Sequence, residues 1–239
     1  MTLQKSLPLG ILDVERGISN SATPPIHVPG TLFHPDTFNF PVVGETVAGA
    51  WVEKVVGGEP GLEPAFIATA QRLVERGAVA ITSTCGFSVR YQQALASAVK
   101  VPVITSSLLL VPLLLRQLPC ESKLAVLTYD STFLGKDMLE LNDPRDATRV
   151  VIGGIEGGKY WHDGLKLPLP PIDVAAVEIE VQARIATLRD AHPETAAILF
   201  ECAAFPCVAA SIRRTANLPV YDITDLCRIT MASVRAATA

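Results

Sequence analysis

The sequence AVAITSTCGF at residues 78–87 and the sequence TAAILFECAAF at residues 195–205 are the most informative about the fold of this chain. Each segment is a short, unbroken apolar run that reaches a cysteine and is followed by a stretch of helical character. Continuous apolar runs of this length are typical of strands buried on both faces of a parallel sheet. Their alternation with helices predicts β-α-β units. The chain is therefore expected to adopt an α/β fold.

The two segments belong to an internal repeat. A shift of 117 residues, close to half of the 239-residue chain, places Cys85 on Cys202 and Pro102 on Pro219. Self-similarity at a fixed spacing indicates duplicated structural units. We therefore predict two similar lobes with parallel sheets flanked by helices. The lobes are expected to be related by pseudo-twofold symmetry, with the active site in the cleft between them.

The repeat also predicts the limits of the lobes. Lobe 1 is expected at residues 1–105 and lobe 2 at residues 106–222, and the C-terminal helix at residues 223–239 is expected to join lobe 1. Strands are expected at residues 7–12, 78–83, 101–105, 124–128, 149–152, 196–200 and 218–221. Helices are expected at residues 62–76, 89–99, 108–118, 173–191, 205–216 and 224–237.

Local signals mark several ends of these elements. Gly77 is expected to close a helix in the left-handed conformation, and Asp173 and Thr224 are expected to be N-caps. Two stretches rich in proline and glycine, residues 23–64 and 143–173, are predicted to be long irregular regions. Such regions are either functional lids and partner surfaces or simple surface excursions.

Composition excludes several classes of protein. Hydrophobic residues make up 49% of the chain and charged residues 18%, which excludes a disordered chain. The 20 basic and 24 acidic residues give a net charge of −4 without a block of like charges, so neither nucleic acid nor an anionic membrane is expected as the main partner. The longest apolar stretch, residues 101–115, contains two prolines and is too short to span a bilayer.

The cysteines and histidines favour a reducing compartment and no metal. The five cysteines form no Cys-x-x-Cys pair, and the four histidines lack metal-ligand spacing. The N-terminal sequence has no apolar run of a signal peptide. We therefore expect a soluble cytoplasmic protein with no metal and no cofactor. The oligomeric state is left open, and a homo-oligomer is allowed.

Cys85 and Cys202 are the candidate catalytic residues. Each follows a predicted parallel strand, and the carboxyl ends of such strands are where α/β folds bind ligands. Each also precedes a predicted helix, whose N-terminal amides are expected to lower the pKa of a thiol. The alternative is that each is a small buried apolar residue. Two thiols that face one another suit a racemase, which takes a proton from one face of a carbon and returns it to the other.

Four motifs together resemble those of the aspartate/glutamate racemase superfamily. The sequence FECAAFP at residues 200–206 is similar to the family's Leu-Gly-Cys-Thr-His-Phe-Pro, and CGFS at residues 85–88 loosely matches Cys-Asn-Thr. VLTYDST at residues 126–132 is similar to Leu-Ala-Thr-x-x-Thr, and GILD at residues 10–13 resembles the family's opening strand. This family includes glutamate, aspartate and hydantoin racemases, arylmalonate decarboxylase and maleate isomerase. The resemblance covers nearly the whole chain.

The resemblance implies a cofactor-independent racemase or epimerase that acts at the α-carbon of a small carboxylate or hydantoin-like substrate. It implies proton transfer by Cys85 and Cys202, with fixed donors around the substrate carboxylate. The implied substrate-binding residues are Asp13, Gly86, Phe87, Thr128, Tyr129, Ser131, Ala203 and Ala204. The family's Thr-His is replaced by Ala203 and Ala204, and its Asn-Thr by Gly86 and Phe87, which argues against glutamate as the substrate.

Two alternatives remain open. The first is an enzyme similar to arylmalonate decarboxylase or maleate isomerase that uses Cys202. Decarboxylases of this kind keep only the second-lobe cysteine, so Cys85 argues against it, whereas Tyr129 resembles the tyrosine of their carboxylate pocket. The second alternative is a two-lobed module that binds a small molecule without catalysis. The identity of the substrate does not follow from the sequence.

Overall fold

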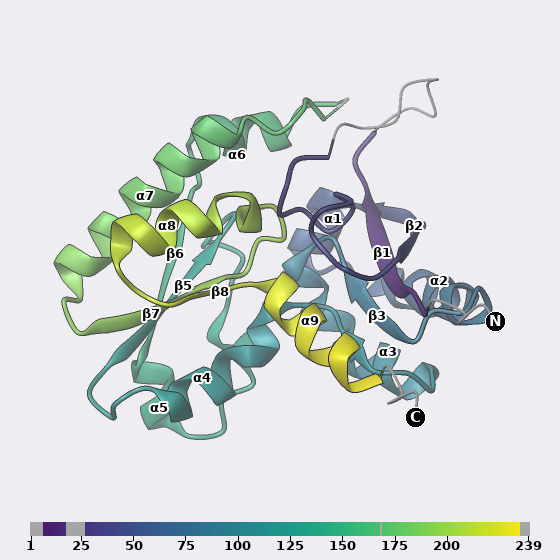
Figure 1. Cartoon of the computed structure of the whole chain (residues 1–239), viewed down its shortest axis with the longest axis horizontal. Helices are drawn as coiled ribbons and strands as arrows, with labels where there is room; N and C mark the ends of the chain where they lie inside the picture. Colours follow the sequence, from purple (N-terminus) through teal and green to yellow (C-terminus); the bar gives the residue numbers. More distant parts are fainter. Residues whose placement is uncertain (1–6, 18–26, 168, 235–239) are drawn as a thin grey trace.

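Two four-stranded parallel sheets form the framework of the described part of the chain. The computed structural model describes residues 7–17, 27–167 and 169–234. The sheets share one strand order, β2-β1-β3-β4 in lobe 1 and β6-β5-β7-β8 in lobe 2 (Figure 1). The strands are β1 (Leu9–Glu15), β2 (Val42–Trp51), β3 (Ala80–Ser83), β4 (Val103–Ile104), β5 (Lys123–Thr128), β6 (Val150–Gly154), β7 (Thr195–Phe200) and β8 (Val220–Tyr221). The predicted α/β fold with two parallel-sheet lobes is confirmed.

Helices flank both sheets. They are α1 (Val52–Gly57), α2 (Glu63–Glu75), α3 (Gln92–Ala98), α4 (Val111–Gln117), α5 (Pro144–Thr148), α6 (Lys159–Gly164), α7 (Val174–Ala191), α8 (Ala209–Ala216) and α9 (Ile223–Val234). Figure 1 shows α7 and α8 on one side of the lobe 2 sheet and α4 and α5 on the other. Helix α9 follows the last strand of lobe 2 but packs on lobe 1, where Ile223, Cys227 and Met231 contact a cluster that includes Leu9 and Ile11.

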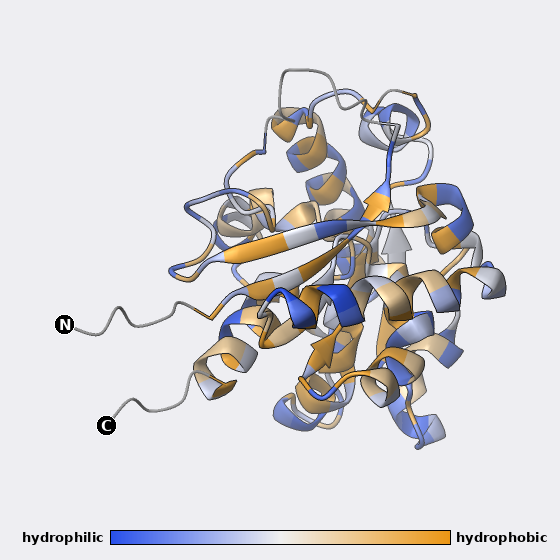
Figure 2. Cartoon of the chain, turned by 90° about the vertical axis from the view of Figure 1, so that its right-hand side faces the viewer, coloured by the Kyte–Doolittle hydropathy of each residue, from blue (hydrophilic) through white to orange (hydrophobic). Residues whose placement is uncertain are grey.

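The strands form because their residues are apolar on both faces. Leu9, Ile11 and Leu12 of β1 are fully buried, and all but the first residue of β5 are buried. Figure 2 shows polar residues on the outer faces of the helices and apolar ones inside. One apolar cluster contains residues of both lobes, and the Ser107 hydroxyl donates a hydrogen bond of 2.6 Å to the carbonyl of Phe200. The two lobes therefore share a core rather than being joined by a linker.

Most of the predicted ends agree with the structure. Gly77 has a φ of +94°, and the Asp173 side chain accepts a hydrogen bond from the amide of Ala176. The prediction for Thr224 is wrong, because its amide and hydroxyl both donate to Asp222, which is the residue that caps α9.

The prediction that residues 23–64 are irregular is wrong in part, because they contain β2. This edge strand pairs only with β1 within the described chain. Its sequence, VVGETVAGAW, has no continuous apolar run, and most of its residues are half-buried. Residues 143–173 likewise contain α5, β6 and α6.

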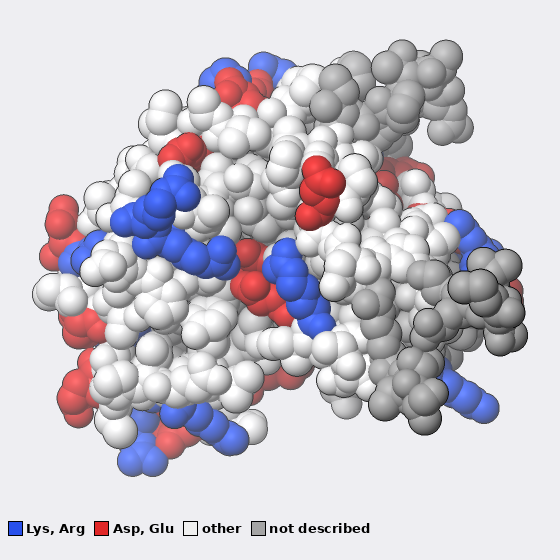
Figure 3. Space-filling view, viewed as in Figure 1, with Lys and Arg blue, Asp and Glu red and all other residues white. Residues whose placement is uncertain are grey.

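Charged side chains of both signs are interspersed on the face shown in Figure 3, and no broad basic area occurs there. Among the described residues, none of the helices combines the length and the apolar character required to cross a membrane.

Candidate active site

Cys85 and Cys202 line one cavity between the lobes. Cys85 lies two residues after β3 ends, and Cys202 lies two residues after β7 ends. The cavity has a volume of about 60 Å³, and Cys85 is only 9% exposed. Other predicted site residues that line it are Gly86, Phe87, Tyr129, Ala203 and Ala204. The parallel strands bring these residues together because their carboxyl ends meet at the same edge of each sheet.

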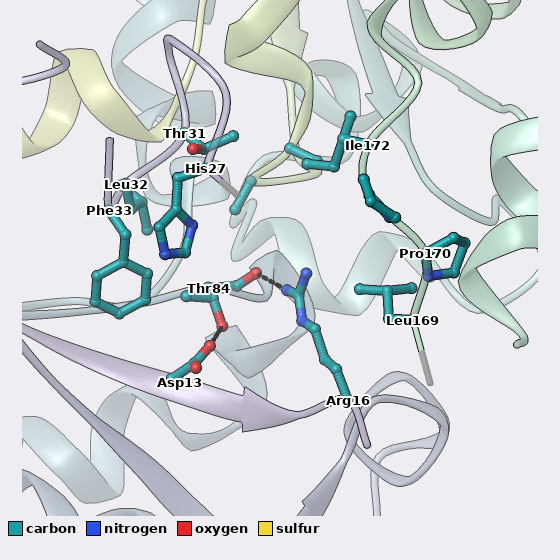
Figure 4. Close-up of a pocket in the computed structure, with 13 residues that line it drawn as sticks. Asp13, Arg16, His27, Thr31, Leu32, Phe33, Thr84, Leu169, Pro170 and Ile172 are labelled. Atoms are coloured by element: carbon teal, nitrogen blue, oxygen red, sulfur yellow. Dashed lines mark hydrogen bonds between the residues drawn. The ribbon is translucent and has the colours of Figure 1, made fainter. Parts of the chain in front are cut away.

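Two larger cavities adjoin this central one. A cavity of about 200 Å³ is lined by Asp13 and His27, and Figure 4 shows Asp13 and Arg16 joined to Thr84 by hydrogen bonds within it. A cavity of about 470 Å³ is lined by Trp161 among others. Arg16 and Leu169 line all three cavities, which therefore form one cleft.

Arg16 supplies a positive charge inside this cleft. It is the sole Lys or Arg among the described residues that line the central cavity. Its Nη2 donates to the carbonyl of Thr84 at 3.0 Å, and its buried Nε has no hydrogen-bond partner in the described part of the chain. The sequence suggests only that Arg16 and Arg90 could help to bind an anion, with a solvated surface arginine as the alternative. The position of Arg16 directly after β1 is the signal that could have found it, since the cysteines also follow strands.

Glu201 is a second site residue that sequence reasoning missed. It precedes Cys202, lines the central cavity and is only 1% exposed. Its Oε2 accepts a hydrogen bond of 2.8 Å from the Thr128 hydroxyl, whereas its Oε1 has no partner within the described residues. Burial raises the pKa of Glu201 to about 7, and hydrogen bonds from Thr128 and the Tyr129 amide oppose this rise. A carboxyl at the end of an unbroken apolar strand is the sequence signal.

The prediction that helix N-termini lower the pKa of the thiols is wrong for this structure. Burial, followed by the charge of Glu201, raises the pKa of Cys85 to about 12 and also that of Cys202 well above its ordinary value. Backbone amides of Phe87 and Ser88 oppose the rise at Cys85. They do not overcome burial. A 3-10 helix follows Cys85 directly, and another begins at Phe205 after Cys202, so neither cysteine stands directly at the start of an α-helix.

Three aromatic rings line the cleft. Tyr129 and Tyr160 line the central cavity, and Tyr129 and Trp161 line the 470 Å³ cavity. Tyr129 meets Tyr160 edge-on with ring centroids 6.1 Å apart, and it stacks with Trp161 at 6.4 Å. The Tyr129 hydroxyl donates to the carbonyl of Trp161, and the Trp161 indole donates to Asp130. These bonds fix α6 over the cleft.

Three predicted substrate-binding residues lie outside the central cavity. Asp13 lines the 200 Å³ cavity, where its carboxyl accepts a hydrogen bond from Thr84 and burial raises its pKa. Thr128 is fully buried and donates to Glu201. The Ser131 amide and hydroxyl both donate to Glu156. The Thr128 and Ser131 hydroxyls therefore hold glutamates, contrary to the expectation that they hold a substrate carboxylate.

Comparison with known proteins identifies relatives by sequence. No protein-family model matches the chain. It is 31% identical over 205 residues to a dimethylsulfoniopropionate lyase of Durusdinium sp. clade D, an alignment that covers 82% of this chain and 66% of the relative. It is also 31% identical over 169 residues to dimethylsulfoniopropionate lyase 5 of Emiliania huxleyi, with 65% of this chain and 34% of that relative covered. The chain thus spans less than two thirds of the length of either relative.

Solved structures agree with the fold. A glycine-to-cysteine mutant of arylmalonate decarboxylase matches with a TM-score of 0.59 at 16% identity, covering 97% of this chain and 95% of the other. Glutamate racemase from Francisella tularensis matches at 0.57 and 12% identity, with 98% and 85% covered. Allantoin racemase from Klebsiella pneumoniae matches at 0.59 and 10% identity, with 97% and 87% covered. The fold that the resemblance in the sequence implies is thereby confirmed, and the chain has the two-lobed fold of arylmalonate decarboxylase, glutamate racemase and allantoin racemase.

Proposed function

We propose that the chain is a cofactor-independent lyase that cleaves a small carboxylate bearing an onium group, with dimethylsulfoniopropionate as the substrate. One observation carries the proposal: thiols from both lobes, an arginine and aromatic rings line one cavity. The names of the sequence relatives support this choice of substrate. The shared fold supports carbon-acid chemistry, since arylmalonate decarboxylase and the racemases have it.

The proposed reaction is a β-elimination. A thiolate of Cys85 or Cys202 takes a proton from the carbon beside the carboxylate. The electron pair of that C–H bond forms the carbon–carbon double bond, and the C–S bond breaks with its electrons going to sulfur. The products are dimethyl sulfide and acrylate, and the thiol later returns its proton to water. General acid–base catalysis of this kind contributes about 10²- to 10⁴-fold.

Charge complementarity supports the proposed substrate. The Arg16 guanidinium can pair with the carboxylate through two parallel hydrogen bonds, and its Nε has no partner among the described residues. The rings of Tyr129 and Tyr160 that line the cavity suit the sulfonium, because aromatic rings attract cations. The adjoining cavity is lined by three carboxyl groups, those of Glu15, Glu53 and Asp130, and by two basic side chains, those of Arg16 and Lys166; the excess of acidic groups also favours a cation.

The second candidate function is racemisation or epimerisation of a small carboxylate or hydantoin-like compound. The presence of a cysteine from each lobe in one cavity favours it, because a racemase needs a base on one face of the carbon and an acid on the other. An elimination needs only one base. A decarboxylase that uses Cys202, and a binding module, are the remaining outcomes.

The test is to incubate the purified full chain with dimethylsulfoniopropionate and measure dimethyl sulfide in the headspace and acrylate in solution. Both products are expected in equal amounts, and their release should persist after exhaustive chelation and dialysis. In parallel, chiral 2-substituted acids and hydantoins are incubated in deuterium oxide. α-Deuterium without dimethyl sulfide would favour the racemase, and carbon dioxide from malonates the decarboxylase. Ligand stabilisation that survives alanine at both cysteines, without turnover, would favour the binding module.

A further inference from the structure

A carboxyl lies where the two cysteine-bearing turns meet. Glu201 is adjacent to Cys202 in the chain, and its side chain packs against Gly86, the residue that follows Cys85. A Cβ at position 86 would come within 2.7 Å of Glu201 Cδ and would collide with its Oε1. The glycine therefore makes room for both the carboxyl and the backbone carbonyl of Glu201 beside the first thiol.

The two oxygens of this carboxyl have different surroundings. Oε2 accepts from the Thr128 hydroxyl, whereas Oε1 is buried without a partner within the described residues. An unsatisfied buried acceptor is unfavourable, so each case in a native structure requires an explanation. Oε1 is also the oxygen closest to Gly86. It lies at the cavity that holds both thiols, but neither thiol donates a hydrogen bond to it in this structure, so a thiol has to turn toward Oε1 before its proton can be transferred.

We infer that Glu201 is the proton acceptor for the cysteines, so that a thiol S–H bond breaks, its proton binds Oε1, and a thiolate and a neutral carboxylic acid form. This inference rests on the proposed function, in which a thiolate is the base. The step balances without a further reactant, because the cluster of Glu201, Cys85 and Cys202 carries one negative charge before and after it. The product state contains one thiolate and one thiol.

The electrostatics of the cavity make this transfer uphill, because burial raises the pKa of Cys85 to about 12 but that of Glu201 only to about 7, so Glu201 acts as a general base rather than as a resting proton store. Ionised Glu201 raises the pKa of both thiols, so the two kinds of group titrate as a coupled set. Burial holds the pKa of Glu201 near 7, and the carboxylate is therefore available above neutral pH. The other titratable or charged groups that line this cavity are Arg16, Tyr129 and Tyr160.

The experiment measures alkylation of each cysteine in the full chain by iodoacetamide at a series of pH values, with mass spectrometry of the labelled peptides. If Oε1 receives the thiol proton, the rate at Cys85 or Cys202 rises with pH up to about 7 and then levels, because the number of protons on the cluster no longer changes there. In Glu201→Gln the levelling should disappear, and the rate should rise about tenfold per pH unit towards the pKa of the thiol. Thr128→Val removes a hydrogen bond to the carboxylate, so the pH at which the rate levels, here called the break, should move to a higher value.

Asp222→Asn is the matched control, because Asp222 is a buried carboxyl that lies beside Cys227 instead. It should leave the break unchanged. A wild-type rate that rises through pH 7 without a break, or a break that persists in Glu201→Gln, overturns the inference. Turnover adds a second criterion, since loss of about 10²-fold in Glu201→Gln is expected, whereas faster turnover would mean that Glu201 only suppresses the thiolate. Alkylation needs no substrate, so failure to cleave dimethylsulfoniopropionate would refute the proposed function without affecting this test.

Discussion

In each lobe, a carboxyl and a threonine hydroxyl meet at the ends of two neighbouring strands. The strand that carries the carboxyl in lobe 1 corresponds to the strand that carries the threonine in lobe 2. In lobe 1, Asp13 of β1 accepts a hydrogen bond of 2.9 Å from Thr84, which follows β3. In lobe 2, Thr128 of β5 donates a hydrogen bond of 2.8 Å to Glu201, which follows β7. The strand pairing makes these positions equivalent, since Leu12 lies opposite Ser83 and Leu127 opposite Phe200.

This exchange shows how a repeated fold acquires an asymmetric site. The carboxyl of lobe 1 faces the 200 Å³ cavity and is partly exposed, whereas the carboxyl of lobe 2 is buried beside both thiols. The thiols therefore occupy equivalent positions in the fold but unlike surroundings. Cys85 is 9% exposed, and Cys202 is half-buried next to Glu201.

The largest expected effect is that of Cys202→Ser. We expect loss of about 10²-fold or more in dimethyl sulfide release, because a general base is removed. Cys85→Ser should cost less if elimination uses one base. If racemisation is the reaction, both changes should abolish net conversion, and each variant should retain α-proton exchange with at most one enantiomer, opposite for the two. Headspace analysis and deuterium exchange measure these quantities. Unchanged turnover in both variants would show that neither thiol is catalytic.

The second largest effect is expected for Glu201→Gln, which should change how the free energy of unfolding depends on pH. Burial raises the pKa of folded Glu201 to about 7 from an ordinary value of 4.5, so the unfolded chain binds fewer protons between these pH values. Stability therefore falls as pH rises through this window, by about 3 kcal/mol. The variant should match the wild type near pH 4.5 and exceed it above pH 7 in urea unfolding.

The lobe 1 counterpart, Asp13→Asn, should change stability with the same sign, because burial also raises the pKa of Asp13. The change should be smaller, because Asp13 is only half-buried. Equal effects of the two variants would contradict the asymmetry of the lobes.

Arg16→Gln should lower kcat/KM by about 10- to 100-fold, which is the size expected for the loss of a charge-assisted hydrogen bond to the substrate carboxylate. Arg90→Gln is the control, since Arg90 is exposed and donates to the carbonyl of Phe133. It should leave kcat/KM within about twofold. Equal losses in the two variants would show that Arg16 has no special role.

The smallest effects are expected at the residues that follow the cysteines. Gly86→Ala should destabilise by about 1–3 kcal/mol, because the added methyl group collides with Glu201. Ala203→Gly, at the equivalent position of lobe 2, should cost only about 0.4–1 kcal/mol through backbone entropy. Thermal unfolding measures both. Combining Gly86→Ala with Glu201→Ala should relieve only part of the first cost, because the added methyl group also meets the backbone carbonyl oxygen of Glu201.

The sequence predicted those parts of the molecule that depend on local pattern. Strands β3 and β7 are continuous apolar runs, and both end next to the cysteines as expected. Strand β2 was missed because it is an edge strand with few buried residues. The burial of Glu201 could not be predicted locally, since it depends on contact with Gly86 in the other lobe.

Helix α9 has a consequence for the order in which the molecule folds during synthesis. Strand β1 leaves the ribosome early, but Ile223, Cys227 and Met231, which cover Leu9 and Ile11, are made long afterwards. Lobe 1 must therefore keep part of its apolar surface uncovered while lobe 2 is translated. Such transient exposure favours association with chaperones or aggregation. Lobe 1, although it is the first to be made, is the last to complete its core.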